Sequence, residues 1–189
     1  MHQATLVGQC AADDAACSRR HPSAPIAVGA RFFPDVSADV AGTGTPILRL
    51  ESADPGVLAV EQGALRAVRP GSSAVLISTD DGSVVDFVQM WVAPATQLTL
   101  ARRDGDRITD SLALAVGEDV TLVPTLWSGS QRLSGDADVS WTASSGAPLA
   151  ILRDGSADRR RLKARAPGKA TLTVALGDVK TTVDVEVVP

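Results

Sequence analysis

The stretch "RAVRPGSSAVLIST", residues 66–79, decides the fold, because it returns in closely similar form as "KARAPGKATLTVAL", residues 163–176. In both copies a Pro-Gly pair separates two runs that are rich in β-forming residues. Proline lacks an N–H and ends one strand, and glycine accepts the backbone angles needed to enter the next. Each copy therefore predicts two strands joined at a Pro-Gly break.

The repeat extends upstream of this phrase. "AVGARF" (27–32) aligns with "AVGEDV" (115–120), and "LRLESADPGVLAV" (48–60) aligns with "VSWTASSGAPLAIL" (139–152). A repeat of about 90 residues is too long for a solenoid unit. It fits two complete small β-sandwiches in tandem, with loops that differ in length.

Side-chain alternation supports strands. In "VKTTVDVEVV" (179–188), Val183, Val185 and Val187 share one parity, whereas Asp184 and Glu186 take the other. This pattern predicts a strand with one buried face and one solvated face. In "VVDFVQMWV" (84–92) both parities are apolar, so the sequence does not assign an inner face.

Composition favours the same class and excludes others. The 189 residues contain Gly and Pro throughout, only 3% aromatic residues and no Tyr, which predicts an all-β chain with aliphatic cores. The formal net charge of −4 argues against a general nucleic-acid binder, since such domains have a pI above about 9. No apolar run approaches the roughly 20 residues of a membrane helix, so we expect no direct membrane insertion.

These motifs together resemble the bacterial Ig-like (Big) family, group 2. The first copy shows Val28-Gly29, "ESADPGVLAV" and "LRAVRPGSSAVLIS"; the second shows Val116-Gly117, "VSWTASS" and "LKARAPGKATLTV". The first copy departs from the pattern because Leu50 stands where the second has Trp141. The resemblance implies two tandem immunoglobulin-like β-sandwiches, which we place at residues 1–94 and 95–189.

The two cysteines, Cys10 and Cys17, lie close together in the N-terminal segment of the first predicted domain. A pair confined to one segment suits a local disulfide in an oxidising compartment. The alternative is a metal site that adds His2 and His21, although the gap between the cysteines is longer than in common zinc sites. The segment "MHQATLVGQC" lacks the basic start and the apolar core of a signal peptide, so no leader is visible in this chain.

Two clusters of charge are candidate ligand sites. In "DRRRLKAR" (158–165), a strand with Leu162 inward would direct a row of four cations outward. This row could bind an anionic polysaccharide or lipopolysaccharide, or it could protect an exposed sheet edge. Calcium, which needs several oxygen ligands, is a weaker alternative at a second, acidic cluster; otherwise we expect no cofactor. The cations are Arg159, Arg161, Lys163 and Arg165, and the acidic residues are Asp104, Asp106, Asp110, Glu118 and Asp119.

No catalytic set is visible, since the only histidines lie near the N-terminus and no Ser lies in a G-x-S-x-G motif. We therefore expect no enzyme, but a spacer, adhesion or assembly module of a bacterial cell-surface or secreted protein, located outside the cell, on its surface or in the periplasm. Its expected partners are a cell-surface protein or polysaccharide. The alternatives are a binding module for anionic polysaccharide or lipopolysaccharide, and a structural subunit that assembles through an edge strand. The tryptophans are expected in the core or at an interface, not as sugar-stacking platforms.

Overall fold

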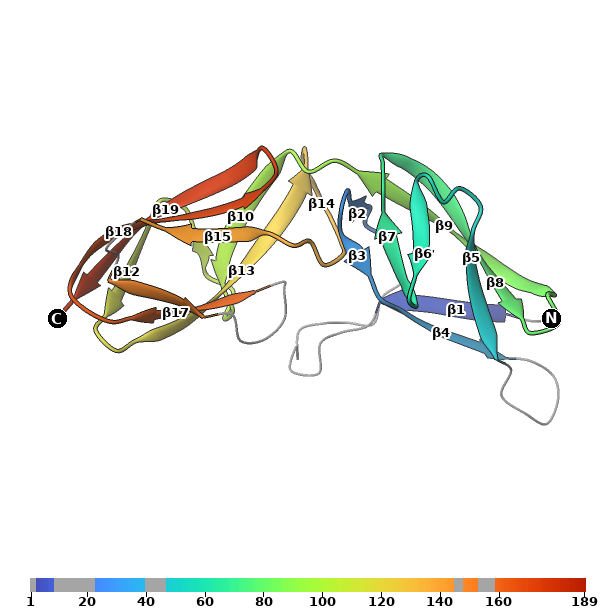
Figure 1. Ribbon diagram of the computed structural model, residues 1–189, viewed down its shortest axis with the longest axis horizontal. Coiled ribbons are helices and arrows are strands. Elements are labelled where there is room, and N and C mark those ends of the chain that lie inside the picture. The colour runs from blue at the N-terminus through green and yellow to red at the C-terminus, as the bar shows by residue number, and fades with distance from the viewer. Residues whose placement is uncertain (1–2, 9–22, 40–46, 145–147, 153–158) are drawn as a thin grey trace. The chain divides into compact units, whose positions relative to one another are not determined.

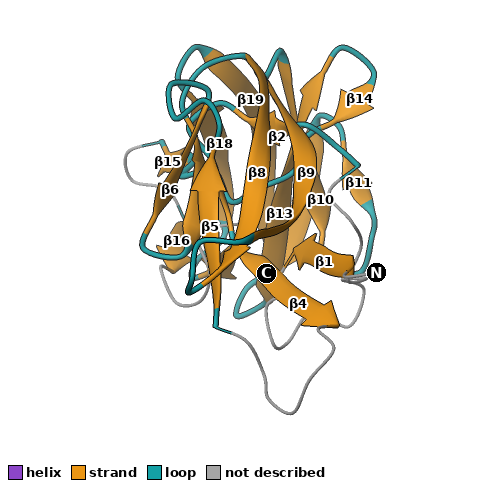
Figure 2. Ribbon diagram, turned by 90° about the vertical axis from the view of Figure 1, so that its right-hand side faces the viewer, coloured by secondary structure: helices purple, strands orange, loops and turns teal. Residues whose placement is uncertain are grey.

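The computed structural model describes residues 3–8, 23–39, 47–144, 148–152 and 159–189, and these residues form strands, turns and loops without a helix (Figure 2). They form two compact β units, which confirms the predicted all-β fold of tandem sandwiches. The first unit holds residues 1–94 together with 132–136, and the second holds residues 95–131 and 137–189. The backbone N–H of Ser134, in the short later segment of the first unit, donates to the carbonyl of Pro25 at 2.8 Å.

The first unit is built from three sheets, with strand orders β2-β9-β8-β5, β3-β7-β6 and β1-β4 (Figure 1). All neighbouring strands are antiparallel except β2 and β9, which are parallel. The strands are β1 (Gln3–Gly8), β2 (Ile26–Ala27), β3 (Arg31–Phe32), β4 (Pro34–Asp39), β5 (Leu48–Ser52), β6 (Leu58–Glu61), β7 (Ala64–Ala67), β8 (Gly71–Thr79) and β9 (Val84–Ala93).

The second unit has two sheets, with strand orders β12-β19-β18-β15 and β11-β10-β13-β17-β16, and β14 also pairs with β13. Here β12 and β19 form the parallel pair. The strands are β10 (Gln97–Arg102), β11 (Arg107–Ile108), β12 (Ser111–Ala115), β13 (Asp119–Ser128), β14 (Gln131–Arg132), β15 (Ser140–Ala143), β16 (Leu149–Leu152), β17 (Arg160–Ala164), β18 (Gly168–Leu176) and β19 (Val179–Val188).

The Val-Gly turns that begin both repeats make matching hydrogen bonds. The N–H of Gly29 donates to the carbonyl of Ala67, and the N–H of Gly117 donates to the carbonyl of Ala164, each at 2.9 Å. Both glycines have positive φ, +82° and +87°, which favours glycine because it has no Cβ. The repeated Val-Gly phrase therefore marks the same turn in both units.

The two Pro-Gly pairs also occupy equivalent positions, one in each unit. Gly71 begins β8 and pairs with Val92, and Gly168 begins β18 and pairs with Val187. Their φ angles are +149° and +150°. The register places Leu50 opposite Ile77 in the first unit and Trp141 opposite Val174 in the second, which supports the predicted replacement of tryptophan by leucine.

The cores are aliphatic, as the composition predicts. Alternate residues of the central strands are buried, and the predicted inner face of the last strand is correct, since Val183, Val185 and Val187 are buried. For the strand that the sequence leaves unassigned, β9, the inner face is Val88, Met90 and Val92. Burial of each such side chain contributes about 1.5–3 kcal/mol, so these faces fix the register of both sandwiches.

Candidate binding surfaces

The predicted basic row lies on β17, and the prediction is wrong for one member. Arg161, Lys163 and Arg165 are exposed, but Arg159 is only 8% exposed and precedes the strand. The strand is not an edge, because β17 pairs with β13 on one side and with β16 on the other. Arg161 and Lys163 therefore face solvent from the middle of a sheet, Arg165 follows directly after the strand, and an edge-protecting role for this strand is excluded.

Acidic and polar neighbours flank the row on β13. Thr121 lies opposite Arg161, and Asp119 lies opposite Lys163, whose Nζ is 4.0 Å from Asp119 Oδ1. Beside them is an open depression of about 460 Å³. Two of its lining residues are joined by a backbone hydrogen bond, in which the N–H of Arg103 donates to the carbonyl of Thr121 at 3.0 Å. The surface is thus mixed in charge, with cations in excess along β17.

The candidate calcium ligands are not brought together. Among the described residues, no group of three or more His, Cys, Asp and Glu side chains is placed to hold a metal ion. Glu118 instead accepts the N–H of Ala115 at 2.9 Å and lies 3.7 Å from a guanidinium nitrogen of Arg102. Asp104 and Asp106 are exposed in the turn between β10 and β11, and Asp110 precedes β12. In the described part of the chain, these five residues are therefore not gathered into one cation site.

The outward face of β18 and β19 is polar and internally paired. Lys169 Nζ lies 3.6 Å from Glu186 Oε1, and Thr171 Oγ1 donates to Asp184 Oδ1 at 3.2 Å. A depression of about 340 Å³ is lined by these four residues together with others that include Ser111. Exposed pairs of this kind contribute little to stability, at most about 1 kcal/mol.

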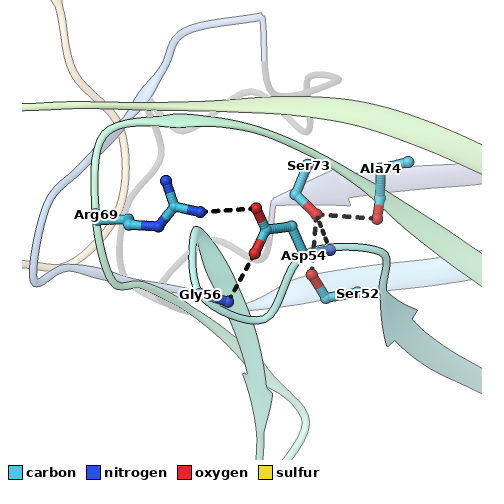
Figure 3. Close-up of polar contacts among 6 residues, drawn as sticks. All are labelled: Ser52, Asp54, Gly56, Arg69, Ser73 and Ala74. Carbon is cyan, nitrogen blue, oxygen red and sulfur yellow. Dashed lines mark hydrogen bonds and ion pairs between the residues drawn. The ribbon is translucent and has the colours of Figure 1, made fainter.

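The Asp-Pro-Gly turn of the first unit is held by the Asp54 carboxylate (Figure 3). Its Oδ1 accepts the N–H of Gly56 at 3.0 Å, and its Oδ2 accepts from Arg69 Nη2 at 2.9 Å. Side-chain acceptance from the residue two positions ahead is the usual way in which aspartate closes a turn. Arg69 directly precedes Pro70-Gly71, so the ion pair ties the two turns of this repeat together.

A buried hydroxyl anchors the same turn from the inner side (Figure 3). Ser73 Oγ accepts the N–H of Asp54 at 2.9 Å and lies 3.0 Å from Ser52 Oγ. Ser73 is buried, and a buried polar group needs such partners. This network satisfies the backbone around the turn, and it is structural.

The tryptophans have three different environments. Trp127 is half-buried and donates its Nε1–H to Thr99 Oγ1 at 2.9 Å. Trp141 is half-buried, and its enclosed Nε1 has no partner among the residues that the structure describes. Trp91 is 53% exposed on the outer face of β9, so it does not lie in the core, and an interface position for it stays a prediction. Both parities of residues 84–92 are apolar, so alternation could not reveal this outward position.

Cys10, Cys17, His2 and His21 lie outside the described residues, so the disulfide stays a prediction. Asp81, in the described turn after β8, accepts from Thr79 Oγ1 at 2.6 Å and from the N–H of Ser83 at 3.1 Å. These bonds, the one from Thr79 first, lower the pKa of Asp81 below its ordinary value. The group is a fully exposed turn carboxylate, which does not point to acid–base catalysis.

In the described part of the chain, no helix has the length and apolar character that a membrane span requires. Neither a family model nor a curated protein matches the sequence.

Solved structures do match. Domains 4 and 5 of the S-layer protein SbsC match with 20% identity over 87% of this chain and 94% of that one, at a TM-score of 0.37. A longer SbsC structure matches with 18% identity over 98% of this chain but 28% of its own length, at a TM-score of 0.36. The Yersinia pseudotuberculosis adhesin InvE matches with 14% identity over 97% of this chain and 58% of that one, at a TM-score of 0.39. At these identities and TM-scores, the partners and assemblies of those proteins say nothing about those of this chain.

Proposed function

We propose that the chain is a non-catalytic tandem Ig-like module of a bacterial cell-surface or secreted protein, with domains at residues 1–94 and 95–189, which acts as a spacer, adhesion or assembly segment outside the cytoplasm. The observation that supports this most is the repetition of one sandwich framework, down to the paired hydrogen bonds of Gly29 and Gly117. A repeated rigid scaffold suits the presentation of surfaces. Loop and outer-face residues, which vary between the repeats, would then supply the binding.

The test is to incubate the purified chain with bacterial envelope fractions and to follow both retention and chemical change. Retention of the protein, with no altered envelope component detected by mass spectrometry, is the expected result. Catalytic turnover that a single substitution abolishes would overturn the proposal.

A second candidate function is the binding of anionic polysaccharide or lipopolysaccharide by the β17 row. It is favoured by the exposure of Arg161 and Lys163 on a central strand and of Arg165 directly after it. Residues two apart on one face of a strand are separated by roughly 6.6 Å, which is the spacing of Arg161 and Lys163 along β17. Arginine binds such anionic groups through two parallel hydrogen bonds.

The matching experiment changes those three residues to Gln and measures binding to lipopolysaccharide at two salt concentrations. The control changes three exposed cations elsewhere in the second unit, Arg107, Lys169 and Lys180, to Gln, so that the net charge is the same. Loss of salt-sensitive binding only in the β17 variant supports this function, since exposed charges are screened by salt. Equal binding by both variants would exclude it.

A further inference from the structure

The outward face of β8 and β9 in the first unit carries two exposed aromatic rings. Phe87 and Trp91 lie four residues apart on β9, on the same face, and are 62% and 53% exposed. Gln89 lies between them and is half-buried. The alternate residues, Val88 and Met90, fill the core. The other face of β9 is therefore buried as expected, and the two rings are exposed without any shift of the strand out of the core.

The neighbouring strand β8 adds three uncharged side chains to this face. Directly opposite the three β9 residues, β8 presents Leu76 beside Phe87, Ala74 beside Gln89 and Ser72 beside Trp91. Cross-strand neighbours on one face lie about 4.5–5.5 Å apart. We call these six residues the aromatic face: Ser72, Ala74, Leu76, Phe87, Gln89 and Trp91.

The second repeat provides an internal comparison. Because Gly71 opposite Val92 corresponds to Gly168 opposite Val187, each position of the aromatic face has a counterpart on β18 or β19. The counterparts are Lys169 for Ser72, Thr171 for Ala74, Thr173 for Leu76, Thr182 for Phe87, Asp184 for Gln89 and Glu186 for Trp91.

The counterpart face is held together by polar contacts. Lys169 and Glu186 form an ion pair at 3.6 Å, and Thr171 donates to Asp184 at 3.2 Å. The same strand pair thus tolerates a polar outer face, so the fold itself does not require the aromatic rings of the first repeat. Exposed apolar patches on soluble domains commonly mark binding sites.

We propose that the aromatic face binds a neutral polysaccharide chain. The distance from Phe87 to Trp91 along the strand is about 14 Å, and the two strands that carry the face lie about 5 Å apart. This surface is far smaller than the roughly 800 Å² per partner that a stable protein interface buries. It suits a narrow, linear ligand that follows β9.

The aromatic rings and hydrogen-bonding groups of this face suit a sugar ligand. The C–H face of a pyranose ring stacks on an aromatic ring as an apolar surface, and Phe87 and Trp91 supply two such rings along one line. The amide of Gln89 and the hydroxyl of Ser72 can donate to and accept from sugar hydroxyls. None of the six side chains is charged, and Glu51 of β5, directly opposite Leu76, is acidic and exposed. Both observations favour a neutral ligand over an anionic one.

The inference rests on the proposed non-catalytic function, because the ligand is bound and released unchanged. The test uses the full chain and affinity electrophoresis in gels that contain hydroxyethylcellulose, a soluble β-1,3-glucan, amylopectin or galactomannan. The variant Phe87→Thr/Trp91→Glu gives the face the residues that the second repeat carries on the same strand pair, so we expect it to fold. The control, Thr182→Ala/Glu186→Ala, changes the counterpart positions. Both are checked by circular dichroism.

We expect at least one neutral polysaccharide to retard the wild type and the control, with little effect of added salt. The Phe87→Thr/Trp91→Glu variant should bind at least about tenfold more weakly, as is typical when central aromatic anchors are removed. Absence of retardation in every gel, or equal retardation of the variant, would overturn the inference. Concentration-dependent dimerisation that replaces sugar binding and is lost in the variant would assign the face to a second copy of the chain instead. Release of new reducing ends would contradict the non-catalytic function and not the site.

Discussion

Replacement of Gly71 by alanine should destabilise the first repeat more than replacement of Gly168 by alanine destabilises the second. The two glycines begin equivalent strands with φ of +149° and +150°. This region is essentially restricted to glycine, and a non-glycine residue there costs about 1–3 kcal/mol. The backbone contribution is therefore the same in both repeats.

The surroundings of the added methyl group differ. A Cβ on Gly71 would lie 3.0 Å from Cγ2 of Val57, whereas a Cβ on Gly168 would lie 3.5 Å from Cγ of Pro148, an ordinary contact. Val57 is buried, so it has little room to move, and overpacking of a core costs about 1–3 kcal/mol. We therefore expect a loss of about 2–6 kcal/mol for Gly71→Ala and about 1–3 kcal/mol for Gly168→Ala.

The assay is urea unfolding followed by pulsed hydrogen exchange and mass spectrometry, in which peptides from β8 and β18 report on the two repeats separately. For a urea slope of about 1–3 kcal/mol per M, Gly71→Ala should lower the midpoint of the β8 peptide by about 1 M or more. The midpoint of the β18 peptide should fall less in Gly168→Ala. Equal shifts, or a larger shift for Gly168→Ala, would refute the argument from the Val57 contact.

Three further substitutions test single contacts. Trp141→Phe should change the free energy of unfolding less than Trp127→Phe, because only the Trp127 indole N–H loses a bond, worth about 1 kcal/mol; urea unfolding compares the two. Asp54→Ala should cost about 1 kcal/mol through its turn and its exposed ion pair, and Asp54→Asn should restore part of this in the same assay, since its amide oxygen can still close the turn. Thr79→Val should raise the pKa of Asp81 towards 3.8 in a carboxyl NMR titration; since the folded pKa is lowered, the stability from this group is present above pH 3.8 and is lost as pH falls through the folded value.

The framework could be predicted from local signals. Pro-Gly and Val-Gly pairs mark backbone positions that need glycine, and they recur at equivalent places, as Gly71 and Gly168 show. Alternation in 179–188 identified the buried valines because one parity is charged or polar. These features depend only on residues that are close in sequence, so they can be recognised from the sequence without knowledge of the fold.

The surfaces could not be predicted as well, because they depend on which strands lie side by side. Arg159 precedes β17 and is buried, so extending the alternation to it gave a wrong outward direction. The central position of β17 follows from pairing with two distant strands. Trp91 could be placed outward only once Met90 and Val92 were known to be buried, since both parities of that strand are apolar.

The most direct test is to move the aromatic face from one repeat to the other. Starting from Phe87→Thr/Trp91→Glu, we would add Thr182→Phe, Glu186→Trp and Lys169→Ser, and measure retardation by the neutral polysaccharide that the wild type binds. If the two repeats share one scaffold and differ in their outward residues, binding should be lost in the first variant and at least partly regained in the second. Full retention of binding in the first variant, or no recovery in a folded second variant, would contradict the account.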